Sequence, residues 1–224
     1  GVIAGLVPST NPTSTAIFKA LIAVKSGNAI ILSPHPSAKG CIMEAVNIMK
    51  DMAEKLGAPE GLISCMSFPT AEGTAELMRL SSLILATGGY AMVKAAYSSG
   101  TPALGVGPGN VPAFIERSAD IPKAIKRILD SKTFDNGTIC ASEQAIVTED
   151  CIKKDVKKEL VRQGAHFVYG DDLEKLAQLI IKPNGGLNPR IVGQPAERIA
   201  AMAGIDVPKD TKVLVCEQAG VGRD

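Results

Sequence analysis

Short apolar segments alternate with helix-like segments over the first hundred residues, and this alternation constrains the fold more than any other feature of the sequence. The expected strands occupy residues 2–6, 29–32, 62–66 and 82–85. The expected helices occupy residues 13–25, 37–56, 72–80 and 90–98. Short apolar strands separated by helices indicate βαβ crossovers and a parallel sheet covered on both faces. The sequence therefore predicts an α/β fold built on a parallel sheet.

A stretch rich in Gly and Pro, residues 104–112, interrupts this pattern, and we expect a domain boundary near it. A chain of 224 residues is long enough for one or two domains. The helices expected beyond the boundary occupy residues 119–132, 150–163 and 173–180. The strands expected there occupy residues 143–147, 166–168, 191–192 and 212–216. The chain begins without Met and stops soon after the last of these strands, so we expect a segment of a longer protein.

The composition argues against several classes of partner. The formal net charge is +1, and aromatic residues make up 4% with no Trp, so neither a basic surface nor stacking platforms for nucleic acid are expected. No apolar run approaches 18 residues, and no basic and apolar leader opens the chain, so neither a membrane span nor secretion is expected. Five scattered Cys and two His indicate neither a disulfide framework nor a metal site, and they favour reduced thiols in the cytoplasm.

Three loops that follow expected strands gather the residues best suited to a ligand. They are residues 7–12, 33–36 and 87–89, and each combines Gly or Pro with Ser, Thr, His or Asn. Ligands of open α/β sheets lie beyond the carboxyl ends of the strands, where helix starts offer backbone N–H groups. A cofactor site and ordinary βα loops both remain open, because residues 105–109 do not have the spacing of a GxGxxG fingerprint.

Cys140 and Asn11 are the candidates for chemistry. Cys140 follows a tight turn before an expected strand, and it is either a nucleophile or a small residue packed under a loop. Cys65 and Cys216 lie inside apolar strands and are expected to be inert packing, whereas Cys41 and Cys151 lie near helix starts. Asn11 precedes a proline, so it either forms a turn or directs its amide at a developing oxyanion.

Several motifs, in order along the whole chain, resemble one family. They are Pro8–Thr15, Ile31–Pro36, Leu85–Gly89, Gly105–Asn110, Lys132–Gln144 and Ile191–Pro195. Together they resemble the CoA-acylating aldehyde dehydrogenases, and most nearly the aldehyde dehydrogenase half of the bifunctional aldehyde-alcohol dehydrogenases. The resemblance implies an aldehyde dehydrogenase-like fold, with a Rossmann-type NAD-binding domain at residues 1–113 and part of a second α/β catalytic domain at residues 114–224.

The resemblance also implies the roles of individual residues. Cys140 attacks the aldehyde carbonyl and becomes a thioester that CoA resolves to acyl-CoA, while Asn11 and the cysteine's own backbone N–H hold the oxyanion. The residues implied to bind NAD are Pro8, Ser9, Thr10, Ser33, Pro34, His35, Thr87, Gly88, Gly89 and Gly105. NAD is the implied cofactor and CoA the co-substrate, with no metal. A homo-oligomer is implied, as a filament or in a microcompartment for the full-length protein.

Two departures from the hydrolytic aldehyde dehydrogenases accompany the resemblance. Gly105 stands roughly where those enzymes carry a glutamate that activates water, so a thioester here has no general base for hydrolysis. Ser33 stands where many relatives carry a lysine, which removes a fixed charge near the cofactor ribose and suggests a shifted binding mode.

Two other functions remain open from the sequence. A glutamate-semialdehyde-type reductase of the same superfamily needs a site for a charged substrate tail, and the cofactor-side loops supply no Arg or Lys for one. A non-catalytic module for oligomer or filament assembly needs no reactive cysteine at all. Acylation of Cys140 by acetyl-CoA distinguishes the acylating enzyme from the assembly module.

Overall fold

The computed structural model describes residues 1–107, 109–183 and 185–218, and the chain forms two compact units, residues 1–108 and 109–224. Pro108 of the Gly/Pro-rich stretch, Asn184 of the expected loop region and the last six residues of the expected catalytic domain lie outside the described residues. The division falls after residue 108 and not after 113, because strand β6 (Pro112–Ile115) pairs with β7 (Ala145–Thr148) in the second unit.

The first unit is a five-stranded parallel sheet in the order β3-β2-β1-β4-β5. Its strands are β1 (Val2–Val7), β2 (Ala29–Pro34), β3 (Ile63–Cys65), β4 (Leu83–Thr87) and β5 (Ala103–Val106). The chain runs outward from β1 through β2 to β3 and then returns to the other side of β1 as β4. The strand order therefore reverses between β1 and β4, and this switch point is where open α/β sheets bind ligands. The predicted α/β fold with a parallel sheet is confirmed.

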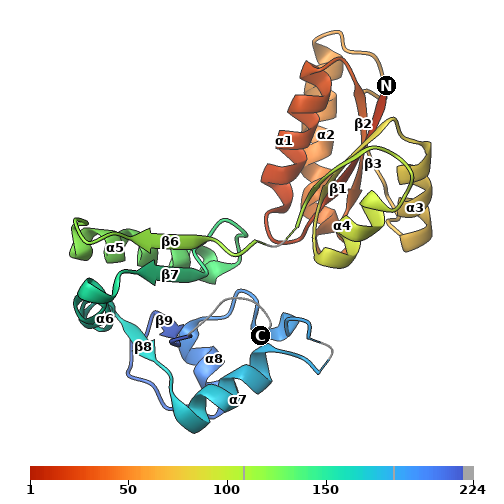
Figure 1. The fold of residues 1–224 in the computed structure, drawn as a ribbon. Coiled ribbons are helices and arrows are strands. Elements are labelled where there is room, and N and C mark those ends of the chain that lie inside the picture. The colour runs from red at the N-terminus through yellow and green to blue at the C-terminus, as the bar shows by residue number, and fades with distance from the viewer. Residues whose placement is uncertain (108, 184, 219–224) are drawn as a thin grey trace. The chain divides into compact units, whose positions relative to one another are not determined.

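Helices cover both faces of this sheet (Figure 1). Helices α1 (Pro12–Lys25) and α2 (Lys39–Lys55) cover one face, and α3 (Ala71–Leu80) and α4 (Tyr90–Tyr97) cover the other. Successive side chains of a strand point to opposite faces, and β1 shows it. Ile3 and Val7 pack with α1 and α2, whereas Ala4 and Leu6 pack with α3 and α4. This burial on both sides explains why the strands read as uninterrupted apolar runs.

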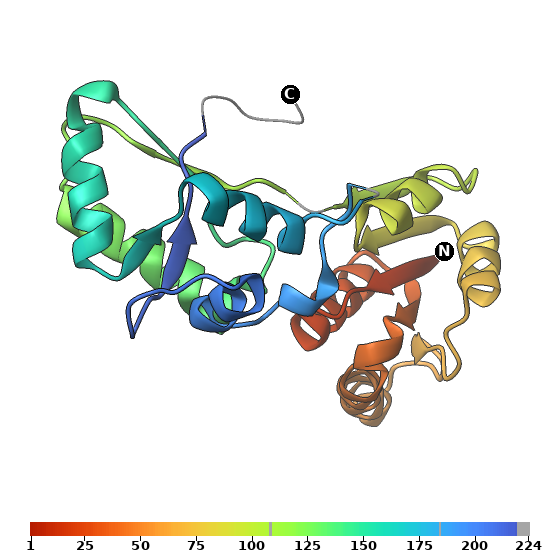
Figure 2. The same cartoon turned by 90° about the horizontal axis from the view of Figure 1, so that it is seen from below.

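The second unit contains two parallel strand pairs, β6 with β7 and β8 (Ala165–Phe167) with β9 (Val213–Val215). Its helices are α5 (Ile121–Thr133), α6 (Lys153–Arg162), α7 (Gly170–Ile180) and α8 (Ala196–Ala203). One apolar cluster joins α5 and α6 to strand residues that include Ile115 and Ala165, and a second joins α7 and α8. Figure 2 shows β9 as the deep blue arrow of the second pair.

Residues 191–192 are not a strand, so the strand predicted there is wrong. Pro189–Ile191 form a 3₁₀ turn, because the Asn188 side chain accepts a hydrogen bond from the Arg190 N–H at 3.1 Å and donates one to the Leu179 carbonyl at 2.9 Å. Strands β5 and β6 and helix α8 were not predicted from the sequence. Both strands have four residues and lie in or beside the Gly/Pro-rich stretch, which hides a strand signal.

The described residues form neither a membrane span nor a metal-binding cluster. Across residues 1–107, 109–183 and 185–218, each helix is too short or too polar to cross a membrane. The same residues contain no group of three or more His, Cys, Asp or Glu side chains arranged to hold a metal ion.

Candidate active site

A cavity of about 330 Å³ opens at the carboxyl edge of the first unit's sheet, at the switch point. The predicted cofactor residues that line it are Pro8, Ser9, Ser33, Pro34, His35, Thr87 and Gly88. Three other predicted cofactor residues, Thr10, Gly89 and Gly105, are not among its lining residues. The cavity also includes Pro69, Thr70, Ala71 and Thr74, which the sequence analysis missed.

A recognisable signal for the missed residues was present in the sequence. Thr70 precedes α3 and caps it, since its Oγ1 accepts a hydrogen bond from the Gly73 N–H at 2.9 Å. The loop before Thr70 follows an apolar strand, as the three predicted loops do. All four loops therefore leave the same edge of the sheet. The same pattern would have predicted residues 67–70 as part of the cofactor site.

Hydrogen bonds between its own side chains shape the polar part of the cavity. The Ser33 and Thr74 hydroxyls lie 2.8 Å apart, and each residue is 6% exposed, so this bond ties the end of β2 to α3. The His35 Nδ1 accepts from the Ser37 N–H at 3.3 Å and lies 2.7 Å from the Ser37 hydroxyl. The proton of the neutral imidazole is therefore on Nε2 when Nδ1 accepts. None of the lining residues is acidic.

The start of α4 offers backbone donors beside this cavity. Gly89 is the N-cap residue and its lack of a side chain leaves the first turn of the helix uncapped. A Cβ on Gly89 would meet no atom within 4 Å, so the approach to this helix end is open. The first N–H groups of a helix have no intrahelical acceptor and favour anions such as phosphate. The residues present therefore fit the pyrophosphate of a dinucleotide.

A buried lysine lies at the switch point, and no sequence signal marked it. The Lys19 Nζ donates to the Leu6 carbonyl of β1 at 2.5 Å and to the Leu85 carbonyl of β4 at 2.6 Å. The residue is 2% exposed, and burial lowers the pKa of its ammonium to about 7. In the sequence Lys19 looks like any helix-surface lysine. In the structure it joins the ends of the two strands that lead into the predicted loops.

Asn11 occupies the N-cap position of α1, yet its side chain does not cap the helix. Its backbone (φ −147°, ψ 65°) is neither helical nor regular β, and its Oδ1 receives only a long hydrogen bond of 3.5 Å from the Thr10 hydroxyl. Within the described part of the chain, its Nδ2 has no hydrogen-bond acceptor. The turn interpretation alone leaves this amide unused, whereas an oxyanion donor requires an amide that is free to donate.

Gly105 lies on β5 beneath α4, away from the cavity lining. A Cβ there would come within 2.8 Å of both the Tyr97 ring and the Val93 side chain. The Tyr97 hydroxyl also accepts from the Gly105 N–H at 3.0 Å. A side chain at this position therefore collides with α4, which gives a packing reason for glycine beside the chemical one.

Cys140 is exposed in the second unit, shortly after an irregular turn. The turn contains three consecutive residues with positive φ, Asp135 (49°), Asn136 (50°) and Gly137 (70°). Buried Ser142 fixes the segment after the turn, because its hydroxyl donates to the Ile139 carbonyl at 3.1 Å. Left-handed non-glycine residues are uncommon and cluster at functional sites. Because Cys140 is exposed, its thiol is accessible and is not sealed in apolar packing.

Exposure alone does not single out Cys140, because Cys41, Cys151 and Cys216 are exposed too. The expectation that Cys216 is inert packing was wrong: β9 ends at Val215, so Cys216 lies just beyond the strand. Cys65 is half-buried in β3, and burial raises the pKa of its thiol to about 11.

A partly buried lysine precedes the Cys140 segment along the chain, and the charge of a glutamate that follows the segment acts on it. Burial lowers the pKa of the Lys132 ammonium, while the charge of Glu143 acts in the opposite direction. The Lys132 Nζ donates to the Gln144 Oε1 at 2.9 Å, and a Cβ on Gly137 would lie 3.2 Å from that Nζ. The Glu143 Oε2 is buried and accepts no hydrogen bond from the described residues. Lys132 therefore contacts both the turn and the segment that carries Cys140.

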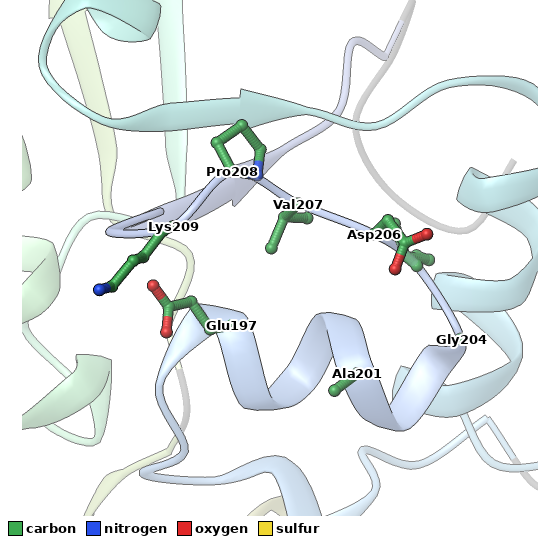
Figure 3. Close-up of a pocket in the computed structure, with 8 residues that line it drawn as sticks. Glu197, Ala201, Gly204, Asp206, Val207, Pro208 and Lys209 are labelled. Carbon is green, nitrogen blue, oxygen red and sulfur yellow. The ribbon is translucent and has the colours of Figure 1, made fainter.

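A second, more open cavity of about 530 Å³ lies between α8 and residues 204–209 (Figure 3). The Glu197 carboxylate and the Lys209 side chain lie at the same end of it, and the Glu197 Oε1 accepts from the Asp210 N–H at 2.6 Å. Its lining contains no predicted site residue and no cysteine. The cavity at the sheet edge is therefore the better candidate for the cofactor.

Residues 1–199 match the model of the aldehyde dehydrogenase family. The chain belongs to that family. It is 49% identical to an aldehyde-alcohol dehydrogenase of Clostridium acetobutylicum over 224 residues, which is 100% of this chain and 26% of that protein. Its structure resembles that of an acetylating aldehyde dehydrogenase from Geobacillus thermoglucosidasius, with a TM-score of 0.92 and 57% identity over 99% of this chain and 49% of that one.

A more distant solved structure carries ligands. It is a propionaldehyde dehydrogenase from Rhodopseudomonas palustris, described with bound CoA and an acylated cysteine. Its TM-score is 0.87 at 32% identity, covering 96% of this chain and 50% of that one. The resemblance to the acylating branch and to the aldehyde-alcohol dehydrogenases is confirmed. This chain spans about a quarter of the bifunctional relative and about half of each of these two structures.

Proposed function

We propose that this chain is the aldehyde-oxidising part of a CoA-acylating acetaldehyde dehydrogenase, which interconverts an aldehyde plus CoA with acyl-CoA. The observation that carries the proposal is the exposed Cys140 shortly after a strained turn, in a chain whose structure resembles an acetylating aldehyde dehydrogenase over 99% of its length. The first unit binds the dinucleotide and the second supplies the thiol. An NAD-linked reaction runs in either direction according to the concentrations of its reactants.

The chemistry assigned to this chain's residues begins at Cys140. Its thiolate adds to the aldehyde carbonyl carbon and forms a C–S bond, and the carbonyl oxygen becomes an oxyanion. The free Asn11 amide donates to that oxygen, with the backbone N–H of Cys140 as the second donor. The oxidant for this adduct would be supplied by a bound nicotinamide, which would take the hydride whose loss from the adduct carbon leaves a thioester on Cys140. The CoA sulfur then attacks the thioester carbon, and Cys140 leaves as thiolate.

Transfer to CoA is favoured over hydrolysis because the described residues that line the cofactor cavity include no carboxylate to activate water. Gly105 replaces the glutamate of the hydrolytic enzymes, and none of the residues that line the cavity is acidic. A thioester reacts readily with a thiol and slowly with unactivated water. The incoming CoA therefore resolves the acyl-enzyme.

The residues that hold the dinucleotide are those of the cavity at the sheet edge, together with the start of α4. We assign NAD as the preferred cofactor. The residues that line this cavity include no Arg or Lys to pair with a 2′-phosphate, which supports NAD over NADP. Calorimetric titration of this chain with NAD and with NADP tests the assignment. Tighter binding of NADP would overturn it.

We further assign the full-length protein to the cytoplasm as a homo-oligomer, in a filament or a microcompartment. Exposed apolar side chains on α1, among them Phe18 (59% exposed) and Leu21 (63%), support a covered surface in the complete protein. The five cysteines are all free, as in a reducing compartment. Light scattering of the full-length protein at several concentrations tests the assembly, and a monomer throughout would contradict it.

The central experiment maps acyl transfer. The chain is incubated with acetyl-CoA, and each cysteine peptide is measured by mass spectrometry. Acetyl on Cys140 that disappears in Cys140→Ala is the expected result, because the thioester forms on that sulfur. Cys151→Ala is the matched control, since Cys151 is also an exposed thiol of the second unit. Acetylation spread over the exposed cysteines, or absent from Cys140 in folded protein, would overturn the proposal.

A further inference from the structure

The turn before Cys140 needs an explanation for its stability. Asp135, Asn136 and Gly137 all have positive φ, and L-residues adopt this region as isolated residues, not in runs. Such a backbone persists only where its surroundings hold it. Within the turn, the Thr138 hydroxyl donates to the Asp135 carbonyl at 2.7 Å, and the Thr138 N–H donates to the same oxygen at 3.1 Å. These bonds close the turn locally but do not place it in the unit.

A second segment, far along the chain, supplies the placement. The Asn136 Nδ2 donates at 3.0 Å to the carbonyl of Gly193, which is 57 residues further on. Gly193 has φ +73°, and a Cβ there would lie 3.0 Å from the Thr138 Oγ1. Only glycine readily combines this backbone with so close an approach. Gly193 therefore contacts the turn in two ways: its carbonyl accepts the Asn136 hydrogen bond, and its missing side chain leaves room for Thr138. Gly193 follows the 3₁₀ turn of Pro189–Ile191.

We infer that Asn136 is a positioning residue, which fixes the thiol-bearing segment through its amide bond to Gly193. The inference rests on the proposed function, in which Cys140 is the nucleophile, and it adds a role for residues 191–195. The left-handed conformation alone does not explain an amide here, because Asp135 adopts the same conformation and its side chain makes no hydrogen bond within the described residues. Asn136 thus has two roles: its backbone adopts the left-handed conformation, and its side-chain amide donates a hydrogen bond to Gly193.

Asp135 provides a matched control for the test. Asn136→Gly and Asp135→Gly relieve the same backbone strain in the same turn, but only Asn136→Gly removes the bond to Gly193. Asn136→Asp is the third variant, because aspartate tolerates the left-handed region while its carboxylate cannot donate. Two readouts are compared in the whole chain: hydrogen exchange of the peptide spanning residues 134–142, and the rate of acetyl transfer from saturating acetyl-CoA to Cys140.

We expect Asn136→Gly and Asn136→Asp to speed exchange in residues 134–142 and to lower the saturated acetyl-transfer rate, each about tenfold. That loss is smaller than the ~10²-fold cost of a 1 Å misplacement. Asp135→Gly should change both by less than about twofold, and the acetyl-CoA concentration for half-saturation should stay constant in all three.

Equal effects of Asn136→Gly and Asp135→Gly would overturn the inference, since strain relief would then explain both. Faster exchange without slower transfer would also overturn it. If the unmutated chain transfers no acetyl group, the proposed function fails, and the exchange data alone still decide whether Asn136 anchors the turn.

Discussion

The cavity at the sheet edge and the turn before Cys140 are built in opposite ways. The cavity follows from regular structure: parallel strands end at one edge, and bonds such as Ser33 to Thr74 join neighbouring elements. The turn has irregular backbone, with three residues of positive φ and an exposed thiol. A bond to Gly193 ties it to a distant part of the chain.

The difference shows how the two tasks place different demands on a protein. A dinucleotide is large and makes many contacts, so its site tolerates small shifts of any one group. The loops at the carboxyl edge of a parallel sheet are sufficient to form such a site. A nucleophile must meet one carbon atom at one angle, so a single segment has to be fixed. Strained backbone is a usual way to hold such a group, and long-range bonds keep the strain from relaxing.

The largest effect is expected at Asn11, which belongs to the same unit as the cavity. Asn11→Ala should lower acetyl transfer to Cys140 by about 10²–10³-fold, the usual cost of losing one oxyanion donor. NAD affinity should stay nearly unchanged, because the amide does not cap α1 and lies outside the cavity lining. Stopped-flow transfer rates and NAD titration measure the two quantities. A parallel loss of NAD affinity would count against the assigned role.

The next largest effect separates two cysteines. At pH 8 the Cys65 thiol, whose pKa burial raises to about 11, is ionised in only about one molecule in a thousand. Iodoacetamide should therefore modify Cys65 about 10²-fold more slowly than exposed Cys140, as followed by peptide mass spectrometry. Unfolding the chain in urea should bring the two rates together. Comparable rates in the folded chain would mean that β3 does not protect its thiol.

Lys19 predicts a pH dependence of stability for the first unit. Burial lowers the pKa of this lysine to about 7, whereas an unfolded lysine titrates near 10.4. Between these values the unfolded chain binds more protons, so the free energy of unfolding should rise with pH by up to about 1.4 kcal/mol per unit. Urea unfolding at several pH values measures it. Lys19→Met should remove this rise, and Lys25→Met, an exposed lysine of the same helix, should not.

The smallest effect is expected at Gly105. Gly105→Ala places a Cβ 2.8 Å from the Tyr97 ring and the Val93 side chain, so it should destabilise the first unit by about 1–2 kcal/mol. Acetyl transfer at a temperature where the variant is folded should remain within about twofold, because alanine supplies no base. Pairing the change with Tyr97→Ala should restore part of the stability; no recovery would mean that the collision is not the cause.

The sequence predicted the regular elements well and the exceptional residues poorly. The strands β1, β2 and β4 and the loops after them were predicted because burial on both faces leaves long apolar runs. Strands β5 and β6 were missed because glycine and proline surround them. Lys19 was missed because a helical lysine looks the same whether it faces water or two strand carbonyls.

The amino-acid sequence by itself determined the fold class, the family, and the two residues most suited to the chemistry, because hydrophobic periodicity and ordered motifs are local properties of the chain. The tertiary structure alone decided that Thr70 and Thr74 join the cavity, that Lys19 bridges β1 and β4, and that Gly193 receives the Asn136 amide. Each of these depends on atoms brought together from distant parts of the sequence. A local sequence pattern does not indicate which distant carbonyl accepts a hydrogen bond from a given side chain.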